Sequence, residues 1–389
     1  MSVQSLPARI TGRVVTAALA LVLVGWLWSV GQAEGGTTAP PAPDPQQYEQ
    51  LVSRGVDYLM HKGQAADGSF SSQASIGITA LDVTALLRLG RTVNDPAVAK
   101  GLKYIEGFVQ PDGGVYQPDS FLRNYETCLA IACFAEANAD GRYTERIKRA
   151  EAFVKGIQWD ESEGKDKTDA SFGGAGYGKH KRPDLSNTSF LIDALKACGN
   201  GPNDAAIQKA LVFVSRCQNL ESEYNTTPYP AKNPDGGFYY TPVAGGVSMA
   251  GDLPNGGLRS YGSMTYAGLK SLIYAGLKAD DPRVKAAKSW IAKHYDLDSN
   301  PGMGPQGLYY YYHTFAKTMA AVGQDEFVDA QGGKHDWRRD LVEALARRQQ
   351  PDGSWVNQQD RWMEGDPNLV TGYALLALSY CRPQPAAAK

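Results

Sequence analysis

Two kinds of helical pattern alternate along this chain between residues 47 and 380. In the first kind, apolar residues recur at helical spacing on one face and charged residues cover the other, which is typical of a helix with one buried side. Asp95-Pro96 and Asp281-Pro282 begin two of these stretches, with the Asp placed to cap the helix and the Pro in its first turn. The six stretches of this kind are 47–62, 96–109, 145–157, 204–218, 283–295 and 336–349.

The second kind of stretch is apolar nearly all round and begins with polar residues, and a helix apolar on every side is buried on every side. The arrangement that buries both kinds is a closed double ring, with six outer helices around six inner ones. We therefore predict an all-α fold, a single α/α toroid or (α/α)6 barrel, over residues 47–381. The six buried stretches are 78–89, 124–137, 186–198, 261–276, 311–322 and 367–380.

A ten-residue motif recurs within the amphipathic stretches. Its order is basic, small, two variable residues, aromatic, aliphatic, three variable residues and Gln, and it is intact at 149–158 and 209–218. Two further copies begin at Arg54 and Lys100, with their glutamines displaced. A unit that recurs every 45 to 65 residues indicates a repeat architecture, so one domain is expected despite the chain's length.

A second motif follows the first, with Gln, three residues, Gly, one residue and an aromatic, as at 110–116 and 349–355. Glycine adopts the backbone angles that end a helix or close a turn. We expect the aromatic side chain to fold back over the helix end and the Gln amide to bond the unpaired carbonyls there.

The paired motifs resemble the QW repeat of the squalene cyclase and prenyltransferase superfamily, and the resemblance covers residues from about 47 to 380. It implies the α/α toroid of that superfamily, with a central cavity lined by the inner helices. The ligand of such a cavity is typically a polyprenyl or triterpene chain. The chain is roughly half as long as a full cyclase, which pairs two toroids, and enzymes with different chemistry share the scaffold.

Protein prenyltransferases of this superfamily hold zinc with an Asp-x-Cys pair that opens one inner helix and a His that opens the next. His313 matches the His, but Tyr261 and Ser263 stand where the Asp and Cys would be. A catalytic zinc needs about three protein ligands and a structural zinc about four. We therefore expect no metal and no cofactor, and elemental analysis of dialysed protein should find no stoichiometric zinc.

Squalene-hopene cyclases protonate an alkene with the central Asp of an Asp-x-Asp-Asp-Thr-Ala segment. Residues 80–85 keep that Asp as Asp82, and they keep the Thr and Ala, but they lack the flanking acids. Flanking carboxyl groups help to stabilise the charge that the lost proton leaves behind. Asp82 is therefore either a proton donor or a structural residue that bonds to the backbone or to a neighbouring Thr.

Polar residues open each inner helix, and parallel inner helices would bring them to one end of the ring. Helix N-termini favour anions there, and a cluster of costly buried ionisable groups is a candidate for function. We predict a cavity at this end, with Asp82, His313 and Asp366 as catalytic candidates; the alternative is that the polar groups only cap helices and bond loops. The predicted ligand-binding residues are Asn124, Tyr125, Glu126, Asn187, Tyr261, Met264, Tyr312 and Trp362.

The first 33 residues have the pattern of a signal peptide. Arg9 and Arg13 precede an apolar run over 14–28, and small residues follow at cleavage-like spacing. An uncleaved anchor is the alternative, and it would associate the protein with a membrane. We expect an exported protein that is periplasmic or membrane-anchored facing outward. Residues 34–46 form a Pro/Gly-rich linker and 382–389 a tail.

The charge of the chain argues against a nucleic-acid-binding protein, and the spacing of its cysteines argues against a cysteine metal site. The formal net charge is −2 and the chain has no basic tract, which argues against a nucleic-acid partner. The five cysteines lie in helical patterns without a C-x-x-C spacing, so we interpret them as small core residues.

Three functions remain. The first is an exported repeat protein that binds or processes an isoprenoid-like apolar ligand in the barrel, as a terpene cyclase/mutase-like enzyme would. The second is a non-catalytic lipid- or isoprenoid-binding toroid. The third is a carbohydrate-active α/α barrel, for which an open groove with paired carboxylates would be diagnostic.

Overall fold

The computed structural model describes residues 42–383. The predicted signal peptide, most of the linker and the end of the tail lie outside the described residues. Within the described part, no helix combines the length and apolar character that a membrane span requires.

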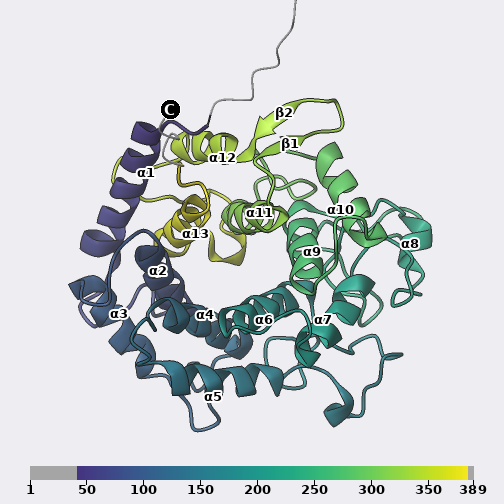
Figure 1. Cartoon of the computed structure of the whole chain (residues 1–389), viewed down its shortest axis with the longest axis horizontal. Coiled ribbons are helices and arrows are strands. Elements are labelled where there is room, and N and C mark those ends of the chain that lie inside the picture. Colours follow the sequence, from purple (N-terminus) through teal and green to yellow (C-terminus); the bar gives the residue numbers. More distant parts are fainter. Residues whose placement is uncertain (1–41, 384–389) are drawn as a thin grey trace, which may run out of the picture. The chain divides into compact units, whose positions relative to one another are not determined.

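Six helices form a closed inner ring in which each helix packs against the next and the last packs against the first (Figure 1). Asn124 and Asn187, in the first turns of two neighbouring inner helices, bond to each other, so these two helices run in the same direction. The ring confirms the six predicted inner helices. In ring order they are α2 (Ile76–Arg88), α4 (Arg123–Glu136), α6 (Leu185–Ala197), α9 (Gly262–Tyr274), α11 (Leu308–Val322) and α13 (Pro367–Ser379).

Six further helices cover the outside of this ring, and each packs against one or two inner helices. The first outer helix also packs against the last, which closes the outer layer (Figure 1). The predicted all-α toroid is thus confirmed. The outer helices are α1 (Pro45–Tyr58), α3 (Pro96–Glu106), α5 (Thr144–Lys155), α7 (Ala205–Arg216), α10 (Pro282–Lys293) and α12 (Trp337–Ala346).

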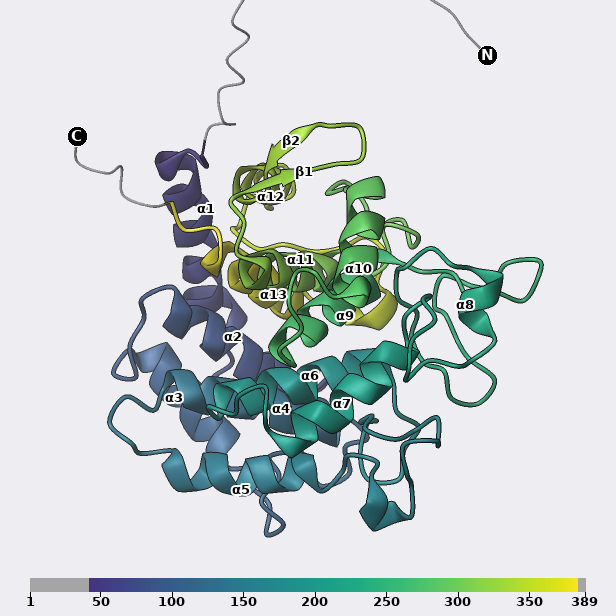
Figure 2. The same cartoon turned by 45° about the vertical axis from the view of Figure 1, so that its right-hand side comes forward.

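A few short elements lie between the ring helices. A π-helical turn, Leu59–Gly63, continues α1, and single 3-10 turns occur at Glu161–Glu163 and Arg361–Met363. The short helix α8 (Tyr229–Lys232) lies in the loop region before α9 (Figure 2). Strands β1 (Glu326–Val328) and β2 (Lys334–Asp336) pair antiparallel with Phe327 opposite His335, and β2 packs against α12.

The two Asp-Pro starts differ in one respect from their prediction. Pro96 and Pro282 open α3 and α10 as expected, and Asp281 accepts a bond from the Arg283 backbone N–H. Asp95, however, makes no cap bond, because its carboxylate accepts from the backbone and hydroxyl of Thr92 in the preceding turn. It therefore stabilises the loop and not the helix end.

Most of the motif glutamines join successive repeats, whereas Gln110 bonds the carbonyls of Phe108 and Tyr116 beside its own helix end. Gln218 Nε2 donates to the carbonyls of Gly236, in its own turn, and of Arg283, in the next outer helix, both at 2.9 Å. Gln158 and Gln349 make the corresponding bonds, and for Gln349 the next outer helix is α1, so its bond closes the ring. The prediction that the amides bond carbonyls at their own helix end was wrong for Gln158, Gln218 and Gln349.

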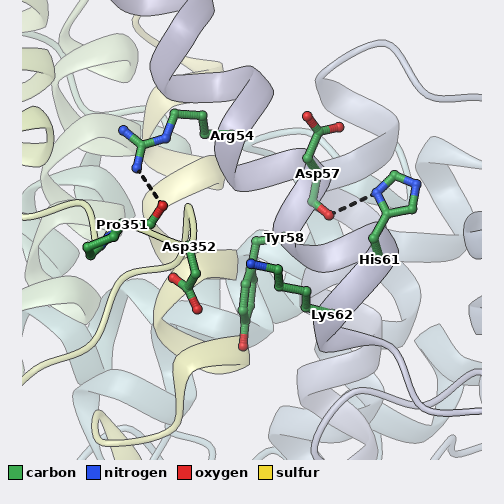
Figure 3. Close-up of a pocket in the computed structure, with 7 residues that line it drawn as sticks. All are labelled: Arg54, Asp57, Tyr58, His61, Lys62, Pro351 and Asp352. Atoms are coloured by element: carbon green, nitrogen blue, oxygen red, sulfur yellow. Dashed lines mark hydrogen bonds between the residues drawn. The ribbon is translucent and has the colours of Figure 1, made fainter.

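The reason for this arrangement lies in the glycine turns. Gly173 has a φ of 80°, and a Cβ there would overlap with the Lys209 carbonyl of the next outer helix. The turn therefore touches that helix, and the amide beside it reaches both backbones. At the ring closure, the basic motif residue Arg54 donates to the carbonyls of Gln350 and Pro351, and Figure 3 shows the second of these bonds.

Threonines near the start of five inner helices bond the loops that precede them. Each accepts a bond from the backbone N–H of a residue just after the glycine turn, over 2.9 to 3.1 Å. Because each Thr must face its loop, the bond sets the rotation of its helix. The five are Thr79, Thr127, Thr188, Thr265 and Thr371, which bond the backbone N–H groups of Phe70, Val115, Ala175, Phe238 and Trp355.

Replacement of Gln218 with Ala should destabilise the protein by about 1–3 kcal/mol, since two carbonyls that face its buried amide would lose a donor. Urea denaturation of the purified variant measures this loss. The matched control is Gln73→Ala, at an exposed position, which should leave the midpoint unchanged. Equal midpoints for both variants would contradict the structural role of the motif amide.

Candidate functional site

Several of the predicted site residues bond the ends of the inner helices. Glu126 accepts from the Ser75 hydroxyl at 2.8 Å and from the Gln117 backbone at 3.3 Å. Asp366 caps α13 and accepts from Ser71. These contacts, like the pair formed by Asn124 and Asn187, connect neighbouring repeats, and a part in ligand binding stays a prediction for them.

The predicted aromatic and thioether residues divide between wall and surface. Tyr312 is buried and donates to the Leu297 carbonyl at 2.6 Å, so its hydroxyl faces the loop after α10. Tyr261 and Met264, at the start of α9, are buried in the core. Trp362 is 45% exposed in a loop before α13, where Arg361 lies over its ring. A ligand-binding surface shared by these four side chains stays a prediction.

Asp82 lies in the wall between two inner helices. Its carboxyl group meets Gly372 of α13, where a Cβ would overlap with Asp82 Oδ1. The side chain is fully buried, and neither oxygen has a hydrogen-bond partner among the described residues. The interpretation of Asp82 as bonded to backbone or to Thr is therefore wrong. Burial, and to a smaller degree Asp366, raises the pKa of Asp82 well above its usual value.

The raised pKa of Asp82 makes stability depend on pH with a definite sign. The folded protein keeps this proton above pH 3.8, where the unfolded chain loses it, so the contribution of Asp82 to stability should fall as pH rises above about 4. The slope for one proton is at most about 1.4 kcal/mol per pH unit. The variant Asp82→Asn has no such proton, so urea midpoints at several pH values should show the wild type losing stability relative to it. The control Asp140→Asn, at an exposed ion pair with Arg142, should not show this divergence; parallel curves for Asp82→Asn would refute the buried neutral carboxyl.

Aromatic and hydroxyl side chains meet across the inside of the ring. The Ser186 hydroxyl of α6 bonds the hydroxyls of Tyr125, from α4, and Tyr310, from α11, both at 2.7 Å. Phe190 of α6 stacks on Tyr310 at 6.3 Å, and Tyr373 of α13 meets Tyr310 edge-on. Because α9 separates α6 from α11 in the ring, these contacts run through its interior. We call Tyr125, Ser186, Phe190, Tyr310, His313 and Tyr373 the aromatic inner face.

His313 also belongs to this face through its contact with Tyr373, and its catalytic role stays a prediction. Its ring lies 5.6 Å from that of Tyr373, and its Nδ1 has no hydrogen-bond partner among the described residues. Burial, with Lys317 adding to it, lowers the pKa of His313 well below its usual value, so the imidazole is neutral.

One carboxylate and two ammonium groups lie further along the inner helices α6, α9 and α11. Asp193 Oδ2 of α6 is 2.6 Å from Lys270 Nζ of α9 and 2.7 Å from Lys317 Nζ of α11. Burial lowers the pKa of Lys270 to about 8 despite Asp193. For Asp193, burial acts to raise the pKa, but the two ammonium groups outweigh it and lower the pKa to about 2. At neutral pH the cluster therefore holds one negative and two positive charges.

The sequence analysis missed this cluster, although a signal for it exists. Asp193 lies five residues after Thr188, and Lys270 lies five residues after Thr265; both threonines bond the backbone of the loop before their helix. An offset of five residues turns a helix side chain to the side opposite the threonine. Aligning the repeats on those threonines would have placed both charges at one level of the interior.

Among the pockets formed by residues 42–383, two lie on the outside of the ring. A pocket of about 510 Å³ is lined by Glu221, Ser222, Asn225, Thr226 and Thr227. The other, of about 420 Å³, lies between α1 with its π-turn and the loop at Pro351, and Figure 3 shows Arg54, Asp57 and His61 in its wall. Neither pocket includes a residue of the predicted site. These pockets therefore do not test the prediction that a cavity opens at the N-termini of the inner helices.

Metal-binding residues do not gather in the described structure: within residues 42–383, no three His, Cys, Asp or Glu side chains converge as a metal site would require. All five cysteines are free; four are buried and Cys198 is half-buried. The predicted lack of zinc remains to be measured.

No family model and no curated protein sequence matches this chain. Solved structures do resemble it. The type II terpene cyclase MstE from Scytonema superposes with a TM-score of 0.53 at 15% identity over 86% of this chain and 98% of that chain. A variant of the same cyclase, at a TM-score of 0.50 and 13% identity over 87% and 97%, was solved with geranylgeranyl dihydroxybenzoate, its substrate.

Carbohydrate-active enzymes resemble the chain to the same degree. A polysaccharide lyase superposes with a TM-score of 0.51 at 13% identity, over 86% of this chain and 96% of that chain. A glycosyl hydrolase of family 88 from Bacteroides vulgatus gives 0.52 at 12% identity, over 86% and 98%. Such identities show the fold, which terpene cyclases share with these enzymes, and leave the choice of ligand to the site itself.

Proposed function

We propose that this protein is an exported toroid that binds an isoprenoid-like apolar ligand at the aromatic inner face. The observation that supports it is the contact of Phe190 and Ser186 with Tyr310, from helices that are not neighbours in the ring. Aromatic walls with a few hydroxyl groups suit an apolar chain with a polar end, because they bury carbon while satisfying few polar atoms. The isoprenoid ligand of the MstE cyclase is consistent with such a wall on this fold.

The geometry favours binding over cyclisation. A proton donor must reach its substrate, within hydrogen-bond distance or through one water. Asp82 has the protonated form that a donor needs, but it is fully buried against Gly372, in the wall between α2 and α13. Turnover as a terpene cyclase would require the two helices to part at this point. A loss of cyclised product in Asp82→Asn, with ligand binding retained, would support that second function.

The carbohydrate-active alternative depends on free carboxylates. Glycosidases use two carboxyl groups about 5 Å or 6.5–9.5 Å apart, one of them as base or nucleophile. The carboxylate that the structure brings to the interior cluster, Asp193, accepts from two lysines through one oxygen. This pairing lowers its basicity, and so the interior gives less support to glycoside hydrolysis than to apolar binding.

Mass spectrometry of the lipid and glycan extracts from protein purified from its native host tests the proposed ligand. An isoprenoid or other apolar molecule should co-purify with the wild type and be lost from Phe190→Ala. The matched control Phe121→Ala, at a side chain that is 72% exposed, should retain it. A bound oligosaccharide, or an apolar molecule retained equally by both variants, would overturn the proposal.

Export is a separate part of the proposal, and it rests on the charge and apolar pattern of residues 1–33. A fusion of residues 1–45 to a reporter that is active only outside the cytoplasm should be active. Removal of residues 14–28 should abolish that activity. If the fusion that carries all of residues 1–45 is inactive, the export proposal is wrong, and the ligand proposal is unaffected.

A further inference from the structure

The buried cluster of Asp193, Lys270 and Lys317 has an excess of positive charge. Both ammonium groups approach the same carboxylate oxygen, Oδ2, while Oδ1 has no partner among the described residues. The nearby Arg88 does not add to the excess, because Glu136 pairs with it at 2.6 Å. An isolated charge in a protein interior is costly unless an opposite charge joins it.

The cluster also has unused hydrogen-bond donors. An ammonium group has three N–H donors, and within residues 42–383 Asp193 is the one acceptor at bonding distance from either lysine. Each lysine therefore keeps about two donors without a protein acceptor. An anion with two oxygen acceptors would satisfy them and would neutralise the excess charge.

Lys317 gives this cluster its open side. The side chain of Lys317 is 16% exposed to solvent and that of Asp193 is 11% exposed, whereas that of Lys270 is only 3% exposed. Lys317 lies one helical turn beyond His313 and two turns beyond Tyr310 on α11, so the three share one face of the helix. The aromatic inner face is thus continuous with the ammonium group of Lys317.

We propose that this cluster binds the carboxylate head group of an amphiphilic ligand whose apolar chain lies along the aromatic inner face. The inference rests on the proposed function and deepens it, because it names the ligand as an acid. The single excess charge matches a monocarboxylate, whereas a diphosphate would bring more negative charge than the two lysines and Asp193 balance. Fatty acids and isoprenoid acids share this head group.

The test compares farnesoic acid with farnesol, which has the same chain and no charge, by titration calorimetry of the full chain. The wild type should bind the acid at least about tenfold more tightly, as expected for hydrogen bonds to charged groups. Lys317→Met should remove this preference and leave farnesol affinity unchanged, and Lys317→Arg should retain it. The control Lys148→Met removes an exposed lysine of α5 and should behave as the wild type.

Palmitic acid distinguishes the two sources of the head group. Tighter binding of farnesoic acid supports an isoprenoid acid, and equal binding supports a fatty acid at the same carboxylate site. Equal affinity of the wild type for farnesoic acid and farnesol would overturn the inference and leave the proposed function standing. Binding of none of the three would overturn the proposed function, and the inference with it. Because these comparisons use the wild type, they decide the matter even where Lys317→Met fails to fold.

Discussion

Replacement of Trp355 with Ala should destabilise the protein by about 3–5 kcal/mol, the usual cost of removing a large aromatic side chain from a packed core. Trp355 is fully buried where the ring closes, with its ring against Gly55 of α1. Its Nε1 donates to the Leu345 carbonyl at 2.9 Å, and its backbone N–H bonds Thr371. The variant therefore loosens the contact between the first and last repeats.

Urea and thermal denaturation of the wild type and of Trp355→Ala measure this decrease in stability. The matched control is Trp362→Ala, which removes the same side chain from a position that is 45% exposed and should cost far less. The burial of Trp355 at the ring closure, and not the loss of a tryptophan as such, sets the expected decrease in stability. A similar loss in the two variants would contradict it.

Replacement of Asp193 with Ala should cost about 3–5 kcal/mol, because two ammonium groups would remain in the interior without their shared counter-charge. The depressed pKa of Asp193, about 2, sets the pH range of the stabilisation from its ionised form. That contribution is present above the usual value of 3.8 and is lost as pH falls through about 2. Denaturation of wild type and variant at neutral pH measures the difference.

A charge-balanced variant separates the cluster's electrostatics from its packing. Replacing Asp193 with Leu together with Lys270→Met and Lys317→Met removes all three charges and should recover most of the stability that Asp193→Ala loses. The exposed pair of Asp140 and Arg142 provides the control, since Asp140→Ala should change stability little. A triple variant no more stable than Asp193→Ala would show that the carboxylate acts through its shape.

The order and kind of the helices were predictable because they depend on local periodicity. Apolar spacing along 78–89 or 204–218 is a property of neighbouring residues, and the alternation of one-sided and fully apolar stretches leaves a double ring as the arrangement that buries both. The glycine turns were predictable for the same reason. What their glutamines bond was not, since the Gly236 turn of Gln218 meets Arg283 only once the next repeat has packed against it.

The candidate site shows the limit of local patterns more sharply. Asp82 meets Gly372 of α13 in the wall of the ring and His313 meets Tyr373 of the same helix, and neither direction could be read from the sequence. One residue along a helix turns a side chain by about 100°, so its direction depends on how the helix is rotated in the ring.

The residues that line the interior were therefore decided by tertiary contacts. Threonines such as Thr188 and Thr265 fix the rotation of their helices by bonding the preceding loops. Ring closure then brings α6 within reach of α11, and only this juxtaposition places Lys317 beside Asp193, 124 residues earlier in the chain. A charge on an apolar helix is visible in the sequence, but its partner depends on the summed geometry of the intervening repeats.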